Sequence, residues 1–173
     1  MKIYLVTISL FLTSNLYAIE IEGSSKFRVQ VQACLDLLSK KAQREYQLIK
    51  DHIGVISQNG RSGMRAWENP PRYQMSDTTA FYSLSWCAGT IAHDAYHSLL
   101  YKKYSSIDGG KPPYEKWAGT SAEKESIDFQ LSVMRKVGAS NHEINYLKSL
   151  DGTHGDVNGD GKLNNEDYKL RDW

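Results

Sequence analysis

The chain has 173 residues, which is enough for one domain with a substantial core and short appendages. Its 21 lysine and arginine residues nearly balance its 20 aspartate and glutamate residues, leaving a net charge of +1. This balance gives no electrostatic basis for binding nucleic acid or an anionic membrane surface, so neither partner is expected.

The N-terminus has the pattern of an export signal. Lys2 supplies a positive charge, and residues 3–12 are apolar but too few to span a bilayer. Residues 13–18 lead to a suitable cleavage position after Ala18. We therefore expect a secreted or periplasmic protein, with a retained anchor or a buried N-terminal strand or helix as the alternatives.

Export also bears on the two cysteines, Cys34 and Cys87. In an oxidising compartment an even number of cysteines predicts a disulfide. The alternative is a pair of buried free thiols. No later segment is long and apolar enough to be expected to cross a membrane.

From Ser25 to Ile53 the sequence has the periodicity of a long helix, with apolar residues every three to four positions. Ser24 or Ser25 can cap its start, and Gly54 can end it. Turn-forming residues follow, and they separate three short segments that suit the strands of a small sheet. These segments are residues 53–57, 64–67 and 73–75. We expect this sheet to form one wall of a cleft.

A second helix is predicted from Ser83 or Ser85 to about Tyr104. Apolar residues cover much of its circumference, so it should be buried on more than one side. His93 and His97 lie one turn apart on the same side of this helix, a spacing that lets two imidazoles bind one zinc ion. Unpaired buried polar groups cost about 1–3 kcal/mol each, so these side chains need a partner.

Another helix is predicted from Thr120 to Val137 and ends at Gly138. Thr120 and Glu123 form a capping-box pattern, which gives Glu123 a structural role at the helix start. Glu125 is not needed for capping and lies in a largely apolar helix, so it is a candidate metal ligand. The alternative for Glu125 is a salt bridge, and helical geometry alone leaves Glu123 open as the ligand.

The segment from residue 83 to residue 137 resembles the zincin-type metallopeptidases. Its H-D-A-Y-H sequence at residues 93–97 is similar to their H-E-x-x-H motif. Residues 123–129 resemble the glutamate helix of the gluzincin and anti-repressor-peptidase-like branches. In those branches the ligand glutamate precedes a small residue and stands four positions before a large apolar one, which matches Glu125.

This resemblance implies a Zn²⁺ ion held by His93, His97 and Glu125, with water at the fourth position. It also implies that the acid after the first histidine, here Asp94, acts as general base on that water. Asp94 stands where the motif has glutamate, so its carboxylate is set back by about 1.5 Å, one C–C bond. Metal binding tolerates that change better than catalysis does.

A second motif occupies residues 156–167, where oxygen-bearing side chains stand at loop positions 1, 3, 5, 9 and 12. Gly161 stands at position 6, where the sharp turn needs glycine, and hard oxygen ligands select Ca²⁺. The loop resembles a dockerin-type calcium repeat. Dockerins carry two repeats and this chain has one, so we expect a local calcium site rather than cohesin binding. The resemblance implies as ligands Asp156, Asn158, Asp160, the Lys162 carbonyl and Asp167, with Asn164 acting through water.

We therefore predict an α+β, mostly α protein with a long N-terminal helix, a small sheet, a histidine helix and a glutamate helix. Residues 1–18 would be a signal peptide, 19–150 a zincin-like metallohydrolase domain, and 151–173 a dockerin/EF-hand-like calcium-binding segment. The leading hypothesis is an exported zinc-dependent hydrolase, a metallopeptidase that acts on a peptide or protein.

Two other functions compete with this hypothesis. The first is a catalytically inactive metal-binding or structural module, with Asp94 marking lost catalysis. The second is a metal phosphohydrolase of the HD type, which would use His52, the His93–Asp94 pair and a later aspartate such as Asp128. That alternative leaves His97 without a role. His154 belongs to neither motif.

Overall fold

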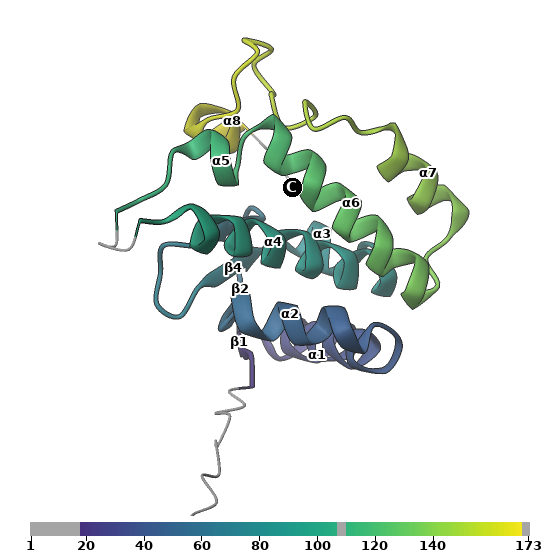
Figure 1. The fold of residues 1–173 in the computed structure, drawn as a ribbon. Coiled ribbons are helices and arrows are strands. Elements are labelled where there is room, and N and C mark those ends of the chain that lie inside the picture. Colours follow the sequence, from purple (N-terminus) through teal and green to yellow (C-terminus); the bar gives the residue numbers. More distant parts are fainter. Residues whose placement is uncertain (1–17, 107–109, 171–173) are drawn as a thin grey trace, which may run out of the picture.

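The computed structural model describes residues 18–106 and 110–170, so the predicted export signal lies almost entirely outside the described residues. The architecture is α+β and mostly helical, as predicted. In Figure 1, α4 lies between α6 on one side and α1 and α2 on the other. The elements are β1 (Glu20–Glu22), α1 (Ser25–Lys41), α2 (Gln43–His52), β2 (Val55–Gln58), β3 (Gly63–Arg65), β4 (Arg72–Met75), α3 (Asp77–Tyr82), α4 (Leu84–Tyr104), α5 (Tyr114–Trp117), α6 (Thr120–Val137), α7 (Asn141–Ser149) and α8 (Asn165–Leu170).

The predicted long N-terminal helix is two helices, α1 and α2, which meet at Ala42. Ser24 caps α1 as expected, because its hydroxyl accepts a hydrogen bond from the Phe27 N–H at 3.3 Å. Ala42 leaves the helical region, with φ −134° and ψ 50°, and is itself buried. Both helices pack on the same core, so the apolar periodicity continues across the break and hides it in the sequence.

The sheet has the order β1-β2-β4-β3. Strands β1, β2 and β4 are parallel, and β3 pairs antiparallel with β4 at one edge. The three predicted strands correspond to β2, β3 and β4. The sequence did not indicate β1, which has three residues and pairs with β2 at the other edge, with Glu20 opposite Val55.

Helix α4 is the central element of the fold. Its N-cap is Ser83, whose hydroxyl accepts from the Trp86 N–H at 2.9 Å, and it ends at Tyr104 as predicted. Its buried residues include Ile91 and Ala95. The predicted disulfide joins Cys87 of α4 to Cys34 of α1 across a separation of 53 residues. Closing a loop of that length stabilises the fold by roughly 4 kcal/mol in the chain-entropy model.

Helix α6 runs antiparallel to α4 and approaches it closely. Glu123, near the start of α6, lies at the histidines of α4, whereas Met134, near its end, lies at Gly89. A Cβ atom on Gly89 would stand 2.6 Å from Met134 Cγ, so any side chain at this position would have to displace Met134. The helix ends at Gly138, as predicted.

The capping box predicted at Thr120 and Glu123 is wrong. The N-cap of α6 is Gly119, and no side chain caps this helix. A capping box of the same pattern occurs instead at Ser140 and Glu143, where it begins α7, a helix that the sequence analysis did not predict. Glu123 therefore has a different role.

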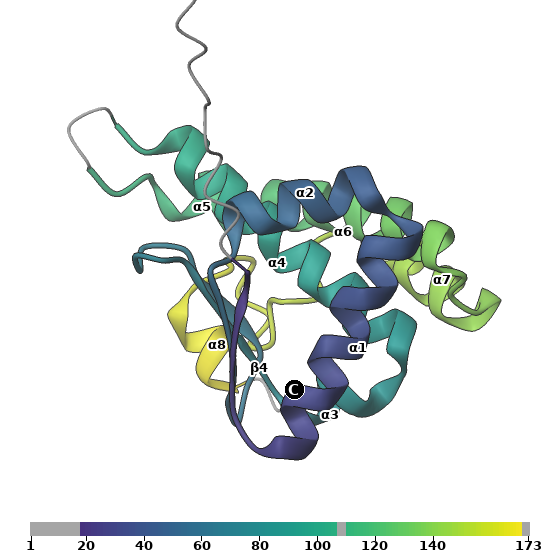
Figure 2. The same cartoon turned by 90° about the horizontal axis from the view of Figure 1, so that it is seen from below.

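The C-terminal segment from residue 151 to residue 170 packs on the rest of the chain. Gly152 lies against the Thr120 carbonyl at the start of α6. The Tyr168 ring packs on Gly63 of β3, and its hydroxyl lies 3.3 Å from Gln74 Oε1. Figure 2 shows α8 beside the sheet. None of the helices in the described ranges is long and apolar enough to span a membrane.

Candidate metal centre

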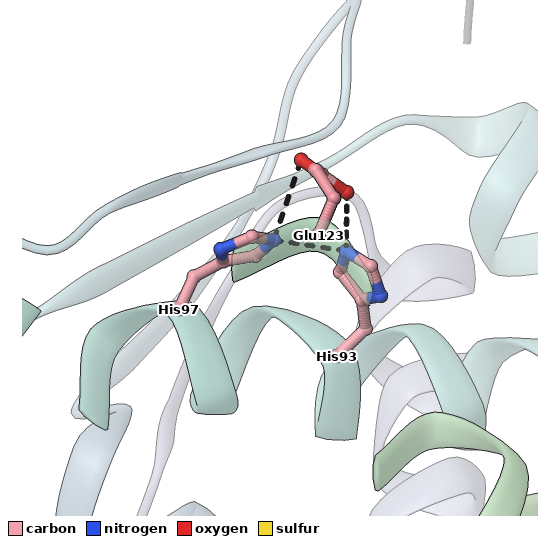
Figure 3. Close-up of side chains that lie close together, drawn as sticks. All are labelled: His93, His97 and Glu123. Carbon is pink, nitrogen blue, oxygen red and sulfur yellow. Dashed lines mark hydrogen bonds and ion pairs between the residues drawn. The ribbon is translucent and has the colours of Figure 1, made fainter. Parts of the chain in front are cut away.

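Three ligand atoms meet between α4 and α6. His93 and His97 point from α4 toward Glu123 on α6 (Figure 3). The two Nε2 atoms are 3.0 Å apart, and Glu123 Oε2 and Oε1 lie 3.3 and 3.5 Å from His93 Nε2 and His97 Nε2. Among the residues that the structure describes, this is the only group of three or more His, Cys, Asp or Glu residues with ligand atoms all within 4.8 Å of one another.

A backbone hydrogen bond fixes the orientation of His97. Its Nδ1 lies 2.6 Å from the Trp117 carbonyl oxygen. A carbonyl only accepts, so Nδ1 carries the proton and donates it. In the neutral ring Nε2 then presents its lone pair to the cluster, the arrangement that metal-binding histidines use.

Burial and mutual attraction set the charges of the cluster. Burial alone would raise the pKa of the Glu123 carboxyl, but the charge of His97 and hydrogen bonds from both histidines hold that pKa well below its usual value. Burial alone would lower the pKa of His97, but the charge of Glu123 and its hydrogen bond raise it. Without a metal ion, the negatively charged Glu123 carboxylate and the protonated form of His97 therefore stabilise each other.

The donor spacing fits a small divalent cation. Ligand bonds of about 2.0–2.1 Å in a tetrahedral zinc site place neighbouring donors about 3.3 Å apart. Here the two Nε2 atoms are 3.0 Å apart, and they lie 3.3 and 3.5 Å from different oxygens of Glu123. With one donor atom from each residue, the three atoms lie within 4.8 Å of one another. Two imidazoles and one carboxylate suit a transition-metal ion of this size, whereas Ca²⁺ takes six to eight oxygen ligands at longer distances.

Comparisons with known proteins do not identify the site independently. No family model, curated protein or solved structure matches this chain.

The structure brings Glu123, not Glu125, to the two histidines, which corrects the predicted third ligand. Glu125 is exposed on α6, and its Oε2 accepts from the Tyr96 hydroxyl at 3.3 Å. Two residues turn a helix by about 200°, so the two glutamates lie on opposite sides of α6. The buried side of α6 carries Glu123 and Ile127, and this shared side was the signal in the sequence that favoured Glu123.

Asp94 lies beside the cluster but is not part of it. It is 8% exposed and lines the same cavity as the histidines. Its neighbour is Tyr73, a fully buried residue of β4. Burial, followed by the negative charge of Asp94, raises the pKa of Tyr73 well above its usual value, so this phenol stays neutral. No pattern in the sequence singled out Tyr73.

The cluster lines a cavity of about 770 Å³. Residues of β3 and β4 form one side of it, as expected of the predicted sheet. His154, which matched neither motif, also lines the cavity, and its Nε2 lies 4.0 Å from Glu123 Oε2. The C-terminal segment therefore contributes a histidine near the candidate metal centre.

The loop at residues 156–167 turns its oxygen atoms toward its own backbone. Asp156 accepts from the N–H groups of Gly159, Asp160 and Gly161, and the buried Asp167 accepts from those of Val157, Asn158 and Asn164. Asn158 and Asp160 accept from the N–H groups of Asp160 and Lys162, respectively.

The Lys162 carbonyl, the remaining predicted ligand, accepts from the Asn164 side chain at 3.4 Å. Gly161 has φ 79°, as its place in the turn requires. These carboxylates do not form a group as close as the α4–α6 cluster.

The residues of the HD-type alternative are not assembled around His93. His52 lies at the end of α2, where burial and then the charge of Lys102 lower its pKa. Asp128 is exposed on α6. Neither belongs to the close group of ligand atoms found in the described part of the chain.

Proposed function

We propose that this protein is a zincin-like, zinc-dependent hydrolase that acts on peptides, with His93, His97 and Glu123 as ligands. The observation that carries the proposal is that one donor atom each from His93, His97 and Glu123 lies within 4.8 Å of the others, in a cavity of about 770 Å³. A zinc ion with three protein ligands supplies a Lewis acid and a water of lowered pKa.

The residues around the centre have separate roles in this proposal. The Trp117 carbonyl holds His97 in the tautomer that binds metal. Asp94 takes a proton from water as the water oxygen bonds to the peptide carbonyl carbon, and gives that proton to the amine as the C–N bond breaks. Neutral Tyr73 lies next to Asp94.

The proposal includes export and a calcium ion. The Cys34–Cys87 disulfide supports an oxidising compartment, and therefore a secreted or periplasmic protein. The side-chain oxygens and the Gly161 turn support a Ca²⁺ site at residues 156–167. Calcium there would stabilise the segment that carries His154.

The second candidate is a module that binds the metal without catalysis. The observation that favours it is Asp94, which is shorter than the glutamate of the motif and is buried against Tyr73. The two candidates share the metal site and differ only in turnover.

Metal content of variants tests the site. We expect one zinc ion per wild-type chain, none in His97→Ala, and at least 100-fold weaker binding in Glu123→Gln. Glu125→Gln is the matched control, because it removes a carboxylate from the exposed side of the same helix. Absence of zinc from the wild type, or loss of zinc in Glu125→Gln with normal binding in Glu123→Gln, would contradict the proposed site.

Turnover separates the two candidates. Asp94→Asn should keep zinc and lose peptide hydrolysis, because an amide cannot accept the proton of water. Asp94→Glu should impair a site adapted to the shorter acid. Zinc binding without turnover in wild type, together with activity that appears in Asp94→Glu, would favour the non-catalytic module.

A further inference from the structure

Aromatic side chains line the cavity on both sides of the metal centre along α4. Trp86, Thr90, His93 and His97 occupy positions i, i+4, i+7 and i+11 of this helix, and all four line the cavity. These positions share one side of a helix. The centre therefore lies within a continuous groove rather than at its end.

The first aromatic group lies toward the start of α4 and consists of Tyr82, Trp86 and Tyr146. The ring centroids of Tyr82 and Tyr146 lie 5.6 and 5.8 Å from that of Trp86. Tyr82 and Tyr146 are 58% and 49% exposed, and all three residues line the cavity. Three helices, α3, α4 and α7, thus present aromatic surface to the same end of the groove.

The second aromatic group lies beyond His97 and consists of Trp67, Tyr114 and Trp117. The rings of Trp67 and Tyr114 pack on Trp117 with centroids 5.9 and 5.6 Å away. Trp117 also contacts Tyr101, one turn after His97 on α4, at 5.1 Å. Trp67 is 45% exposed and lines the cavity. The metal centre is therefore flanked by aromatic surface at both ends.

Two charged side chains that line the cavity beside these groups, Glu143 and Arg65, already have hydrogen-bond partners. Glu143, beside the first group, accepts hydrogen bonds from the hydroxyls of Ser83, Ser85 and Ser140. Arg65, beside the second, pairs with Glu68 and lies 5.4 Å over the Trp67 ring. A ligand that fills the two ends therefore meets aromatic surface beside a hydrogen-bonded carboxylate at the first end and an ion pair at the second. The carboxylate disfavours an acidic side chain there.

We propose, building on the proposed function, that the substrate is an uncharged peptide stretch with large apolar or aromatic side chains on both sides of the reacting bond. Trp86 precedes His93 by about 10 Å of helix axis, and Tyr101 follows His97 by about 6 Å. An extended peptide covers those distances in about two to three residues. Each aromatic group therefore receives a side chain within about three residues of the reacting bond.

The test uses blocked heptapeptides that carry phenylalanine on both sides of the central bond, on either side alone, or on neither, and a set with glutamate instead. Binding to the metal-free protein is measured by tryptophan fluorescence, and hydrolysis is measured with zinc. We expect the peptide with two phenylalanines to bind at least tenfold more tightly than the alanine peptide, and the glutamate peptide to bind weakly.

Variants show which aromatic group binds the peptide side chain on each side of the reacting bond. Trp86→Ala, or Tyr146→Ala at a more exposed position, should remove the preference for phenylalanine on one side of the bond only. Trp67→Ala should remove it on the other side only. Tyr104→Ala is the control, because this aromatic residue is 39% exposed on α4 and does not line the cavity.

Equal binding of the phenylalanine and alanine peptides would overturn the inference, as would tighter binding of the glutamate peptide. An equal loss in Tyr104→Ala would also overturn it. Binding with the expected pattern but no hydrolysis by the zinc-loaded wild type supports this inference and overturns the hydrolase function, so the two failures are distinguishable.

Discussion

The α4–α6 cluster and the loop at residues 156–167 both bring together side-chain atoms of the kinds that can bind metals, but the hydrogen-bond partners of these atoms differ. In the loop, backbone N–H groups donate to the carboxylates of Asp156 and Asp167. In the cluster, the Glu123 carboxylate has the imidazoles of His93 and His97 as its nearest partners. A site satisfied by its own backbone can keep its shape without an ion, whereas a cluster of side chains needs an ion or a shared proton. Removing metal should therefore affect the cluster far more than the loop.

The largest expected effect is the loss of zinc-dependent stability. Zinc at 100 times its dissociation constant should raise the free energy of unfolding by about 2.7 kcal/mol. His93→Ala should abolish this increase, and Asp156→Asn should retain it, because Asp156 lies in the loop. Urea unfolding with and without zinc measures the difference. An equal response in wild type and His93→Ala would mean that the histidines do not bind the ion.

The second-largest expected effect is a loss of stability confined to the loop at residues 156–167. Asp167 is fully buried and accepts three part-buried backbone hydrogen bonds, so Asp167→Ala removes bonds to a charged acceptor at a cost of about 1.5–3 kcal/mol. Limited proteolysis should show faster cleavage between residues 151 and 170, with zinc affinity changed less than tenfold. Glu166→Ala, at the exposed neighbouring position, is the control. A large loss of zinc affinity would show that the loop and the cluster are one unit.

Calcium chelation should have a smaller effect than either substitution. The backbone already satisfies the loop carboxylates, so removing Ca²⁺ should raise the rate of proteolysis in residues 156–167 only a few-fold. A chelator selective for calcium over zinc is needed, and restoring Ca²⁺ should reverse the change. Unchanged proteolysis would count against calcium binding.

The smallest expected effect concerns Glu143, whose carboxylate links α7 to the start of α4. Burial alone would raise its pKa, but hydrogen bonds from Ser83, Ser140 and Ser85 lower it below the usual value. Because the folded pKa lies below the unfolded one, this stabilisation is present above about pH 4.3 and is lost as the pH falls through the folded pKa.

Glu143→Gln should therefore lower the free energy of unfolding by about 1 kcal/mol at pH 7. It should also flatten the loss of stability between roughly pH 5 and 3. Chemical denaturation across this pH range, with Glu125→Gln as control, measures both changes. If the variant had the same pH profile as wild type, Glu143 would not contribute to the loss of stability in acid.

The elements with a long periodic pattern were predictable from the sequence, and the short ones were not. Helices α4 and α6 carry sustained apolar periodicity and clear end signals, Ser83 and Gly138, and both were found with nearly the predicted bounds. Strand β1 and helix α3 are too short for such a pattern, having three and six residues. The break at Ala42 was hidden because both flanking helices face one core.

The sequence predicted those parts of the candidate site that depend on the spacing of residues within one helix, but not those that depend on contacts between elements. The spacing of His93 and His97 is a property of α4 alone, so it could be read from the sequence. The choice between Glu123 and Glu125 depends on how α6 rotates against α4, which is a tertiary property. The pattern at Thr120 and Glu123 predicted a capping box for Glu123, but the capping box lies instead at Ser140 and Glu143. His154 reaches the cavity from a distant segment, and no local pattern indicates such a contact.

The contact between Gly89 and Met134 bears on which ionic radius the centre accepts. It lies one helical turn before His93 and sets how close the two helix axes come. The axis separation sets the distance from Glu123 to the imidazoles, now 3.3 and 3.5 Å. A side chain at position 89 would press on Met134 and could widen that gap without touching Glu123 or either histidine. In the proposed metal centre, selectivity between small and large divalent ions would then depend on a residue outside the coordination sphere.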